Sequence, residues 1–297
     1  MKKRNQNIFI VITTVPALIF YVAIFLYPIF RAVTMSFYRW SGLTSGTEKF
    51  IGLNNFKKLL QDDRFWLTVK NSAVLMICVP VGVVVLALLF AAMLTRRKLA
   101  ENNLYRTIFF LPNVLSVVVI AMLWQLIYHP TLGILNTLLE KVGLESIARV
   151  WLGDAGTALL CVAATMIWTS IGYYLVLFMA GIEGIPEQLY EAAVIDGAGE
   201  VAQFFNITLP LLWEILRVAF ILLISNAFYG ALVFVQVMTN GGPDNASLTM
   251  PNYMYNMAFQ NSNMGYATAV GVAIFIVGIS LSLITDRISK KETVEFQ

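Results

Sequence analysis

The stretch that decides the fold is Ser72–Leu94, with the sequence SAVLMICVPVGVVVLALLFAAML. It contains no Asp, Glu, Lys or Arg, and nearly every residue in it is apolar. An α-helix rises about 1.5 Å per residue, so roughly 20 predominantly apolar residues cross the hydrocarbon core of a bilayer, which is about 30 Å thick. The stretch therefore predicts a membrane-spanning helix.

Five other stretches meet the same criterion, at approximately 8–30, 108–128, 158–180, 218–238 and 264–285, and none of them contains an acidic or basic residue. Composition agrees, since 59% of the chain is hydrophobic and 12% is charged, against roughly 45–50% and about 25% in soluble domains. We therefore predict an all-α polytopic membrane protein. Residues 1–297 are expected to form a single transmembrane domain of six helices.

An even number of spans places both termini on one side of the membrane. Basic clusters at Lys2–Arg4 and Arg96–Lys98 adjoin the first and second spans. Positive charge gathers on the cytoplasmic side of membrane proteins, so these clusters favour cytoplasmic termini. The opposite side carries nearly as many basic residues, but most of them lie in one loop of about 40 residues. The rule counts basic residues that lie close to the membrane, so these residues weigh less.

The side chains exclude several kinds of chemistry. Net charge is +3 without a basic stripe, which argues against nucleic-acid binding. Cys78 and Cys161 lie in apolar runs and are expected to be structural thiols, and no cluster has metal-ligand spacing. The single histidine, His129, follows the third span and is expected to be interfacial.

Energy coupling must come from elsewhere if transport is driven. No Gly-Lys dipeptide occurs in the chain, so the phosphate-binding loop of many ATPases is absent. The spans lack the ionisable groups that a proton relay requires, which weighs against proton-driven carriers. A carrier or channel that works without ATP, and a membrane scaffold or enzyme, remain as alternatives.

The loop at 181–210 has the pattern of a short helix. Pro186 suits the first helical position, Glu187 complements the amino-terminal end of the helix dipole, and Gly197 can supply a left-handed stop. Helical spacing places four residues near one face, where the alanines permit close approach by another protein: Leu189, Ala192, Ala193 and Asp196.

This loop resembles a known signature. Glu191-Ala192-Ala193 is followed after three residues by Gly197, and after nine more by Ile207-Thr208-Leu209-Pro210. The pattern is similar at every fixed position to the EAA signature of binding-protein-dependent ATP-binding cassette (ABC) importer permeases. Other stretches resemble the carbohydrate-uptake branch, which includes maltose, multiple-sugar and glycerol-phosphate permeases: Phe50–Phe56, Ile185–Tyr190, Thr239–Pro243 and Gly265–Ala269.

The resemblance implies the six-span form of the type I importer permease fold, in a bacterial or archaeal cell membrane, with cytoplasmic termini. It implies that this chain binds no cofactor and that ATP and Mg²⁺ bind two partner ATPase subunits. A second homologous permease and an external solute-binding protein are the other expected partners. The helix is expected to dock in a cleft of the ATPase through Glu187, Leu189, Glu191, Ala192, Ala193, Asp196 and Gly197.

The resemblance also suggests where cargo sits. In the maltose permease the sugar site is built from the spans that flank the EAA loop, so we predict Tyr173, Asn226 and Tyr229 first, with Trp168 and Ser225 behind them. Interhelical hydrogen bonding or interfacial anchoring is the alternative role of each residue. The spans carry no charge, so a neutral sugar or oligosaccharide fits better than glycerol phosphate, whose dianion would need Arg or Lys.

Two external loops are expected to contact the solute-binding protein rather than the solute. They lie around Gly52–Phe56 and Asn240–Pro243. Loops of this kind present binding surfaces on a rigid scaffold.

Overall fold

The computed structural model describes residues 2–42, 48–96 and 102–289. The chain divides into two compact units, one made of Met1–Phe65 with Tyr253–Val277 and the other of Trp66–Asn252 with Gly278–Gln297. The assignment of residues 1–297 to a single domain stays a prediction. Arg97 and Lys98, on which the predicted orientation partly depends, lie outside the described residues.

The first unit begins with a long helical segment made of α1 (Lys2–Tyr21), the π-helical turn η1 (Val22–Leu26) and α2 (Tyr27–Met35). A two-stranded antiparallel sheet follows, in which β1 (Tyr38–Arg39) pairs with β2 (Lys49–Phe50), and then α3 (Asn54–Leu60). The unit is completed by η5 (Asn256–Gln260) and the first part of α14 (Met264–Ser289).

Asn55 organises the sheet end of this unit. Its buried amide donates hydrogen bonds to the carbonyl oxygens of Ser36 (2.8 Å) and Tyr38 (3.0 Å). This explains why an asparagine lies at the start of α3, inside the stretch that was expected to contact the solute-binding protein.

The second unit contains most of the spans and the loops between them. Its elements are α4 (Asp63–Arg96), α5 (Asn102–Phe110), η2 (Leu111–Val114), α6 (Val117–Ile127), α7 (Ile134–Lys141), η3 (Glu145–Ile147), α8 (Ala158–Glu183), α9 (Glu187–Ile195), α10 (Glu200–Gln203), η4 (Phe204–Thr208), α11 (Leu209–Leu211), α12 (Trp213–Met238) and α13 (Met250–Tyr255). The first turn of α4 and the end of α13 belong to the first unit.

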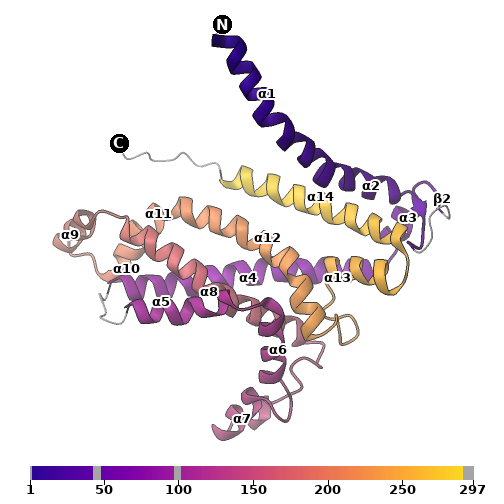
Figure 1. Cartoon of the computed structure of the whole chain (residues 1–297). Coiled ribbons are helices and arrows are strands. Elements are labelled where there is room, and N and C mark those ends of the chain that lie inside the picture. Colours follow the sequence, from indigo (N-terminus) through magenta and orange to yellow (C-terminus); the bar gives the residue numbers. More distant parts are fainter. Residues whose placement is uncertain (1, 43–47, 97–101, 290–297) are drawn as a thin grey trace. The chain divides into compact units, whose positions relative to one another are not determined.

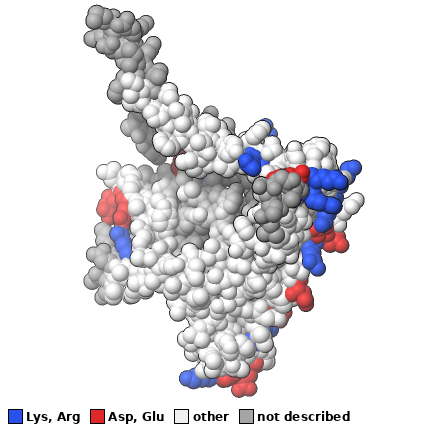
Figure 2. Space-filling view, turned by 45° about the vertical axis from the view of Figure 1, so that its right-hand side comes forward, with Lys and Arg blue, Asp and Glu red and all other residues white. Residues whose placement is uncertain are grey.

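Five segments are long and apolar enough to cross a membrane: Ile12–Met35, Asp63–Thr95, Ala158–Glu183, Trp213–Met238 and Met264–Leu281. A bent pair, Leu104–Val114 with Val117–Ile127, makes a sixth if it counts as one span. Many large apolar side chains on these segments are exposed, and the surface over them carries few charges (Figure 2). The all-α, multi-span fold class is confirmed.

The third predicted span differs from expectation, because it is not one continuous helix over 108–128. The two helices of the pair bend by 102° at the break. Pro112 supplies no amide hydrogen, and Leu115 takes an extended conformation with φ −81° and ψ 151°. Pro16 and Pro80 lie inside helices without such a break, so proline alone does not decide where a span is interrupted.

Helix α8 forms the centre of the second unit. It packs against α5 and α12, and α6 packs against α12 (Figure 1). Gly172 lets α8 approach α5 closely, because a β-carbon there would lie 1.8 Å from the backbone oxygen of Phe109. The core around this contact includes Leu175, Phe178 and Leu223, all almost fully buried.

Candidate functional site

The loop after α8 carries the predicted coupling helix as α9. Pro186 occupies the N-cap with φ −55° and ψ 129°, one position earlier than predicted, and Glu187 is the acidic residue of the first turn. A carboxylate there is favoured by the partial positive charge at the helix amino terminus. The sequence pattern therefore located the start of this helix to within one residue.

The end of α9 is a glycine stop. Gly197 has φ +80°, the left-handed conformation predicted for it. Its amide donates to the carbonyl of Val194 (3.0 Å), and the amide of Ala198 donates to the carbonyl of Ala193 (2.8 Å). These are the two hydrogen bonds of a Schellman motif, which satisfies the last carbonyls of the helix.

Helix α9 has no buried residue. Ile195 is 85% exposed, Val194 is 63% exposed and Leu189 is 40% exposed. Sequence reasoning selected one helical face for docking and so missed Val194 and Ile195, which lie between the signature alanines and the stop. Their apolar character was the available signal, because exposed apolar clusters mark interaction surfaces.

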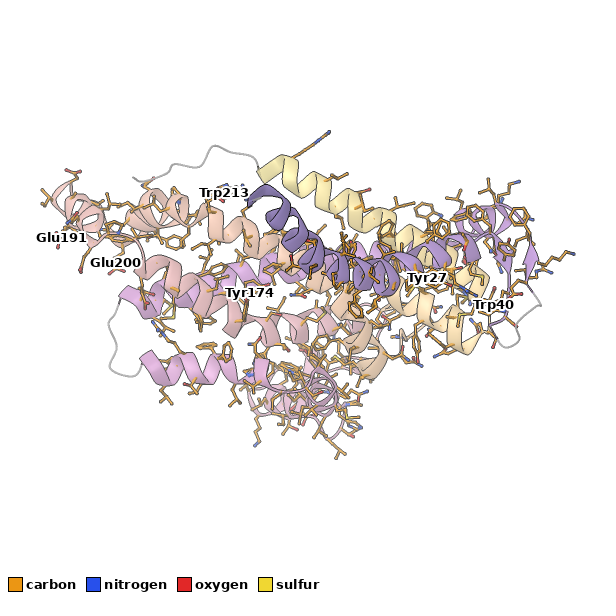
Figure 3. The ribbon with its side chains drawn as sticks, turned by 45° about the horizontal axis from the view of Figure 1, so that its top comes forward. Tyr27, Trp40, Tyr174, Glu191, Glu200 and Trp213 are labelled. Atoms are coloured by element: carbon orange, nitrogen blue, oxygen red, sulfur yellow. The ribbon has the colours of Figure 1, made fainter. Side chains whose placement is uncertain are left out.

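One hydrogen bond connects α9 to the chain that returns to the membrane, and a second holds the turn that follows α9. The hydroxyl groups of Tyr190 and Thr208 lie 2.9 Å apart, and the amide of Gln203 donates to the carbonyl of Ala198 (2.8 Å). Thr208 and Gln203 are buried. Tyr190 of α9 is thereby joined to η4, from which the chain continues through α11 into α12, which begins at Trp213 (Figure 3). Sequence analysis did not predict this connection.

The predicted sugar-contacting residues lie on α8 and α12, two helices that pack together. Tyr173 is 48% exposed and its ring lies 5.1 Å from that of Tyr174, which is buried. The Tyr174 side chain lies near that of Asn226 on α12. Tyr173 and Asn226 therefore both lie next to Tyr174, which is not among the predicted sugar-contacting residues.

The other three predicted residues occupy different surroundings. Ser225 and Tyr229 line a cavity of about 160 Å³ beside Gly278, whereas Trp168 does not line it. The ring of Trp168 instead lies 5.5 Å from that of Trp124 on α6. The structure therefore does not gather all five residues in one cavity of this chain.

The loop between α12 and α13 is held by buried polar side chains. Asn71 of α4 donates to the carbonyl of Leu248 (2.9 Å), and the hydroxyl of Ser72 accepts a hydrogen bond from the amide of Met250 (3.0 Å). Buried polar groups that are hydrogen-bonded in this way fix a loop in one conformation. Asn240 is exposed on this loop, so the predicted contact with a solute-binding protein has an accessible residue there.

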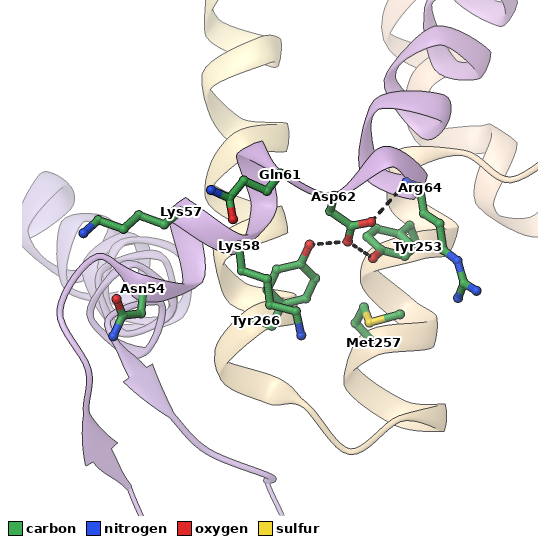
Figure 4. Close-up of a pocket in the computed structure, with 9 residues that line it drawn as sticks. All are labelled: Asn54, Lys57, Lys58, Gln61, Asp62, Arg64, Tyr253, Met257 and Tyr266. Atoms are coloured by element: carbon green, nitrogen blue, oxygen red, sulfur yellow. Dashed lines mark hydrogen bonds between the residues drawn. The ribbon is translucent and has the colours of Figure 1, made fainter.

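A second polar cluster lies in the first unit, at the ends of α4 and α14. The carboxylate of Asp62 caps α4 by accepting the amide of Arg64 (3.0 Å), and it also accepts hydrogen bonds from the hydroxyls of Tyr253 and Tyr266 (Figure 4). Burial raises the pKa of Asp62, but these hydroxyl and amide donors outweigh it and hold that pKa below its usual value of 3.8. Burial and the neighbouring carboxylate raise the pKa of Tyr253 to about 12.

Asp62→Asn is expected to destabilise the protein in a pH-dependent way. Because the pKa of Asp62 is lowered in the folded state, its stabilising contribution is fully present above pH 3.8 and is lost as the pH falls below that value. We expect the midpoint of thermal unfolding at pH 7 to fall by about 3 °C, on a scale of about 2–4 °C per kcal/mol. Fluorescence-monitored melting of detergent-solubilised protein measures this.

The matched control is Asp244→Asn, at an exposed loop position with positive φ that asparagine also tolerates. It should melt like the wild type at every pH. An Asp62→Asn protein whose deficit stays the same at pH 3 and pH 7 would contradict the role of the charged form.

The described residues contain no group of three or more His, Cys, Asp or Glu side chains that could hold a metal ion. The functional features are instead a span bundle and an exposed, rigidly capped helix that protrudes from it. Together they define a membrane-embedded subunit built to engage a partner.

Comparisons with known proteins identify the class. Residues 83–294 match the family described as binding-protein-dependent transport system inner membrane component, and the chain belongs to that family. It is 39% identical over 286 residues to the probable ABC transporter permease protein YurN of Bacillus subtilis, covering 94% of this chain and 95% of that one. It is 36% identical to the diacetylchitobiose uptake system permease protein NgcF of Streptomyces coelicolor, covering 95% and 82%.

A solved structure shares the fold. It is a bacterial ABC transporter involved in the import of the acidic polysaccharide alginate, with a TM-score of 0.81, 22% sequence identity, and coverage of 98% of both chains. The chain is therefore a multi-pass inner membrane permease subunit of a binding-protein-dependent importer and is not itself the ATPase.

Proposed function

We propose that this permease forms half of the translocation pathway for a neutral sugar or oligosaccharide. The observation that carries the proposal is the capped helix α9, which has no buried residue, carries the EAA spacing and is hydrogen-bonded through Tyr190 to Thr208. A relative at 36% identity is named for uptake of diacetylchitobiose, an oligosaccharide. Aromatic and amide groups on α8 and α12 are suitable for binding sugars.

In this proposal α9 docks in a cleft of a partner ATPase subunit. The exposed apolar side chains Leu189, Val194 and Ile195 would be covered there, and Gly197 would fix the direction in which α9 leaves the membrane domain. ATP and Mg²⁺ bind the two ATPase subunits, whose closure moves α9. The hydrogen bond between Tyr190 and Thr208 carries that movement toward α12.

The remaining partners are a second homologous permease and an external solute-binding protein. The spans present polar groups at exposed positions, including Tyr173, Asn226 and Tyr229. A polar group in hydrocarbon is costly unless it faces a cavity or a partner. These side chains therefore suit a pathway formed between two permeases. In this proposal both termini of the chain lie in the cytoplasm.

Glycerol phosphate is the less favoured cargo. Its phosphate would need Arg or Lys at the site, and the charge-free cores of the six predicted spans offer neither. An ATP-independent carrier is less favoured still, because it would leave the capped helix α9 without a partner.

Copurification tests the proposal directly. The tagged chain, expressed with its neighbouring genes and extracted in detergent, is expected to bring down an ATPase and a second permease. ATP hydrolysis by that complex should rise when the external binding protein and its sugar are added. A monomeric chain that never copurifies with an ATPase would contradict the proposed function.

A further inference from the structure

An open pocket of about 650 Å³ lies in the first unit, beside the Asp62 cluster described above (Figure 4). Lys57 and Lys58 of α3 form one side of it, and Arg64 of α4 forms another. Tyr253 and Tyr266 also line it. All these residues belong to the same compact unit, so the pocket is formed within that unit.

The pocket has an excess of positive charge. Three cationic side chains line it, against the single carboxylate of Asp62. Asp62 already accepts hydrogen bonds from two tyrosine hydroxyls and from the amides of Arg64 and Phe65. None of the ion pairs among the described residues includes Lys57, Lys58 or Arg64.

The backbone adds to this charge. Helix α14 begins at Met264, so its amino-terminal end lies at the pocket, whereas the amino-terminal end of α4 is already capped by Asp62 (Figure 4). The amino terminus of a helix carries a partial positive charge. The ammonium group of Lys58 is placed 5.0 Å from the centre of the Tyr266 ring, which orients it at the pocket. The site is arranged for an anion.

We propose that this pocket receives an aspartate or glutamate side chain of the external solute-binding protein. The inference rests on the proposed function, which requires such a partner, and it names the chemistry of the contact. Arg64 can hold a carboxylate through two parallel hydrogen bonds, and the lysines supply point charges beside it.

The position of the pocket favours a protein carboxylate over a lipid phosphate. On α14, the first strongly exposed apolar residue after Tyr266 is Phe275, nine residues on and about 13 Å away along the helix. On α4, the charge-free run begins at Ser72, ten residues after Asp62 and about 15 Å away. The headgroup layer is only roughly 5–8 Å deep on each side. The pocket thus lies at the loop-facing ends of α4 and α14, where a protein carboxylate can reach it.

Open, solvated charges affect encounter rate and specificity more than final affinity, and their effect falls with salt. The test uses the complete transporter in phosphatidylcholine nanodiscs with its purified, sugar-loaded binding protein. Binding and ATPase stimulation are measured at about 50 and about 300 mM salt, because screening of exposed charges increases strongly over roughly this range. The variants are Arg64→Gln, which leaves the Tyr266 ring contact intact, and Lys58→Gln with Arg64→Gln.

The double variant is expected to need about tenfold more binding protein for half-maximal ATPase stimulation at low salt, with a smaller difference at high salt. The control is Lys70→Gln, an exposed cation of the same helix α4 that does not line the pocket. It should behave like the wild type. A charge swap completes the test. Arg64→Glu should weaken binding, and replacing the contacting carboxylate residue of the binding protein with arginine should restore the affinity.

Unchanged affinity in both pocket variants would overturn the inference while the proposed function stands. A defect that appears only when phosphatidylglycerol is added would assign the pocket to lipid and overturn it as well. If no external binding protein stimulates even the wild-type transporter, the proposed function fails first and the inference falls with it.

Discussion

Gly197→Val is expected to lower sugar uptake at least tenfold while the transporter still assembles. Gly197 has φ +80° and no heavy atom within 4 Å of a β-carbon built there, so the substitution causes backbone strain without a steric clash. A β-branched residue is a clear outlier in this conformation, at a cost of roughly 1–2 kcal/mol. The chain would relieve the strain by abandoning the stop, which breaks the hydrogen bond from Ala198 to Ala193 and turns α9 away from its docking direction.

The neighbouring glycine provides a matched control for this substitution. Gly199 is equally free of contacts but has φ −70° and ψ 169°, an extended conformation that valine adopts readily. Gly199→Val should therefore retain uptake, and Gly197→Asn should be intermediate because asparagine tolerates the left-handed region. Uptake is measured in vesicles beside ATPase activity and subunit content. Normal uptake by Gly197→Val would refute the docking role of this helix.

The spans and the coupling helix could be predicted because each depends on local sequence. A charge-free run such as Ser72–Leu94 can satisfy its backbone inside a membrane only as a helix or a closed barrel. Pro186, Glu187 and Gly197 each act within one helical turn, so their effect is visible without the rest of the chain.

Features that depend on partners distant in the sequence could not be predicted. The hydrogen bond between Tyr190 and Thr208 joins residues 18 positions apart, and the cluster around Asp62 joins it to tyrosines about 200 positions later. The break after Pro112 also escaped prediction, because a proline in a span is often accommodated by neighbouring helices.

The candidate sugar site combines both kinds of feature. Aromatic and amide residues on α8 and α12 were visible in the sequence, but the proximity of Asn226 to buried Tyr174 was not. This contact gives Asn226 a structural role that must be separated from sugar binding. Any test by mutation has to remove the two roles independently.

Asn226→Ala is expected to reduce sugar uptake tenfold or more and to change sugar preference. A site that hydrogen-bonds a sugar hydroxyl loses roughly 1–3 kcal/mol when its amide is removed. Tyr173→Ala should have a similar effect through loss of an exposed aromatic face, and Tyr173→Phe should retain most uptake if the ring is what stacks on the sugar. Uptake of several labelled sugars is measured in membranes where assembly and receptor-stimulated ATPase activity persist.

Tyr174→Phe separates the two roles of Asn226. It removes the Tyr174 hydroxyl that lies near Asn226, but it leaves the Asn226 amide in place and nearly preserves the buried volume. If Asn226 serves only to pair with Tyr174, both variants should lose stability alike and keep the wild-type order of sugar preference. If Asn226 contacts the sugar, only Asn226→Ala should reorder the sugars. Normal uptake and unchanged preference in both Asn226→Ala and Tyr173→Ala would place the site elsewhere, on the partner permease, because the exposed faces of α8 and α12 would then have no role in binding.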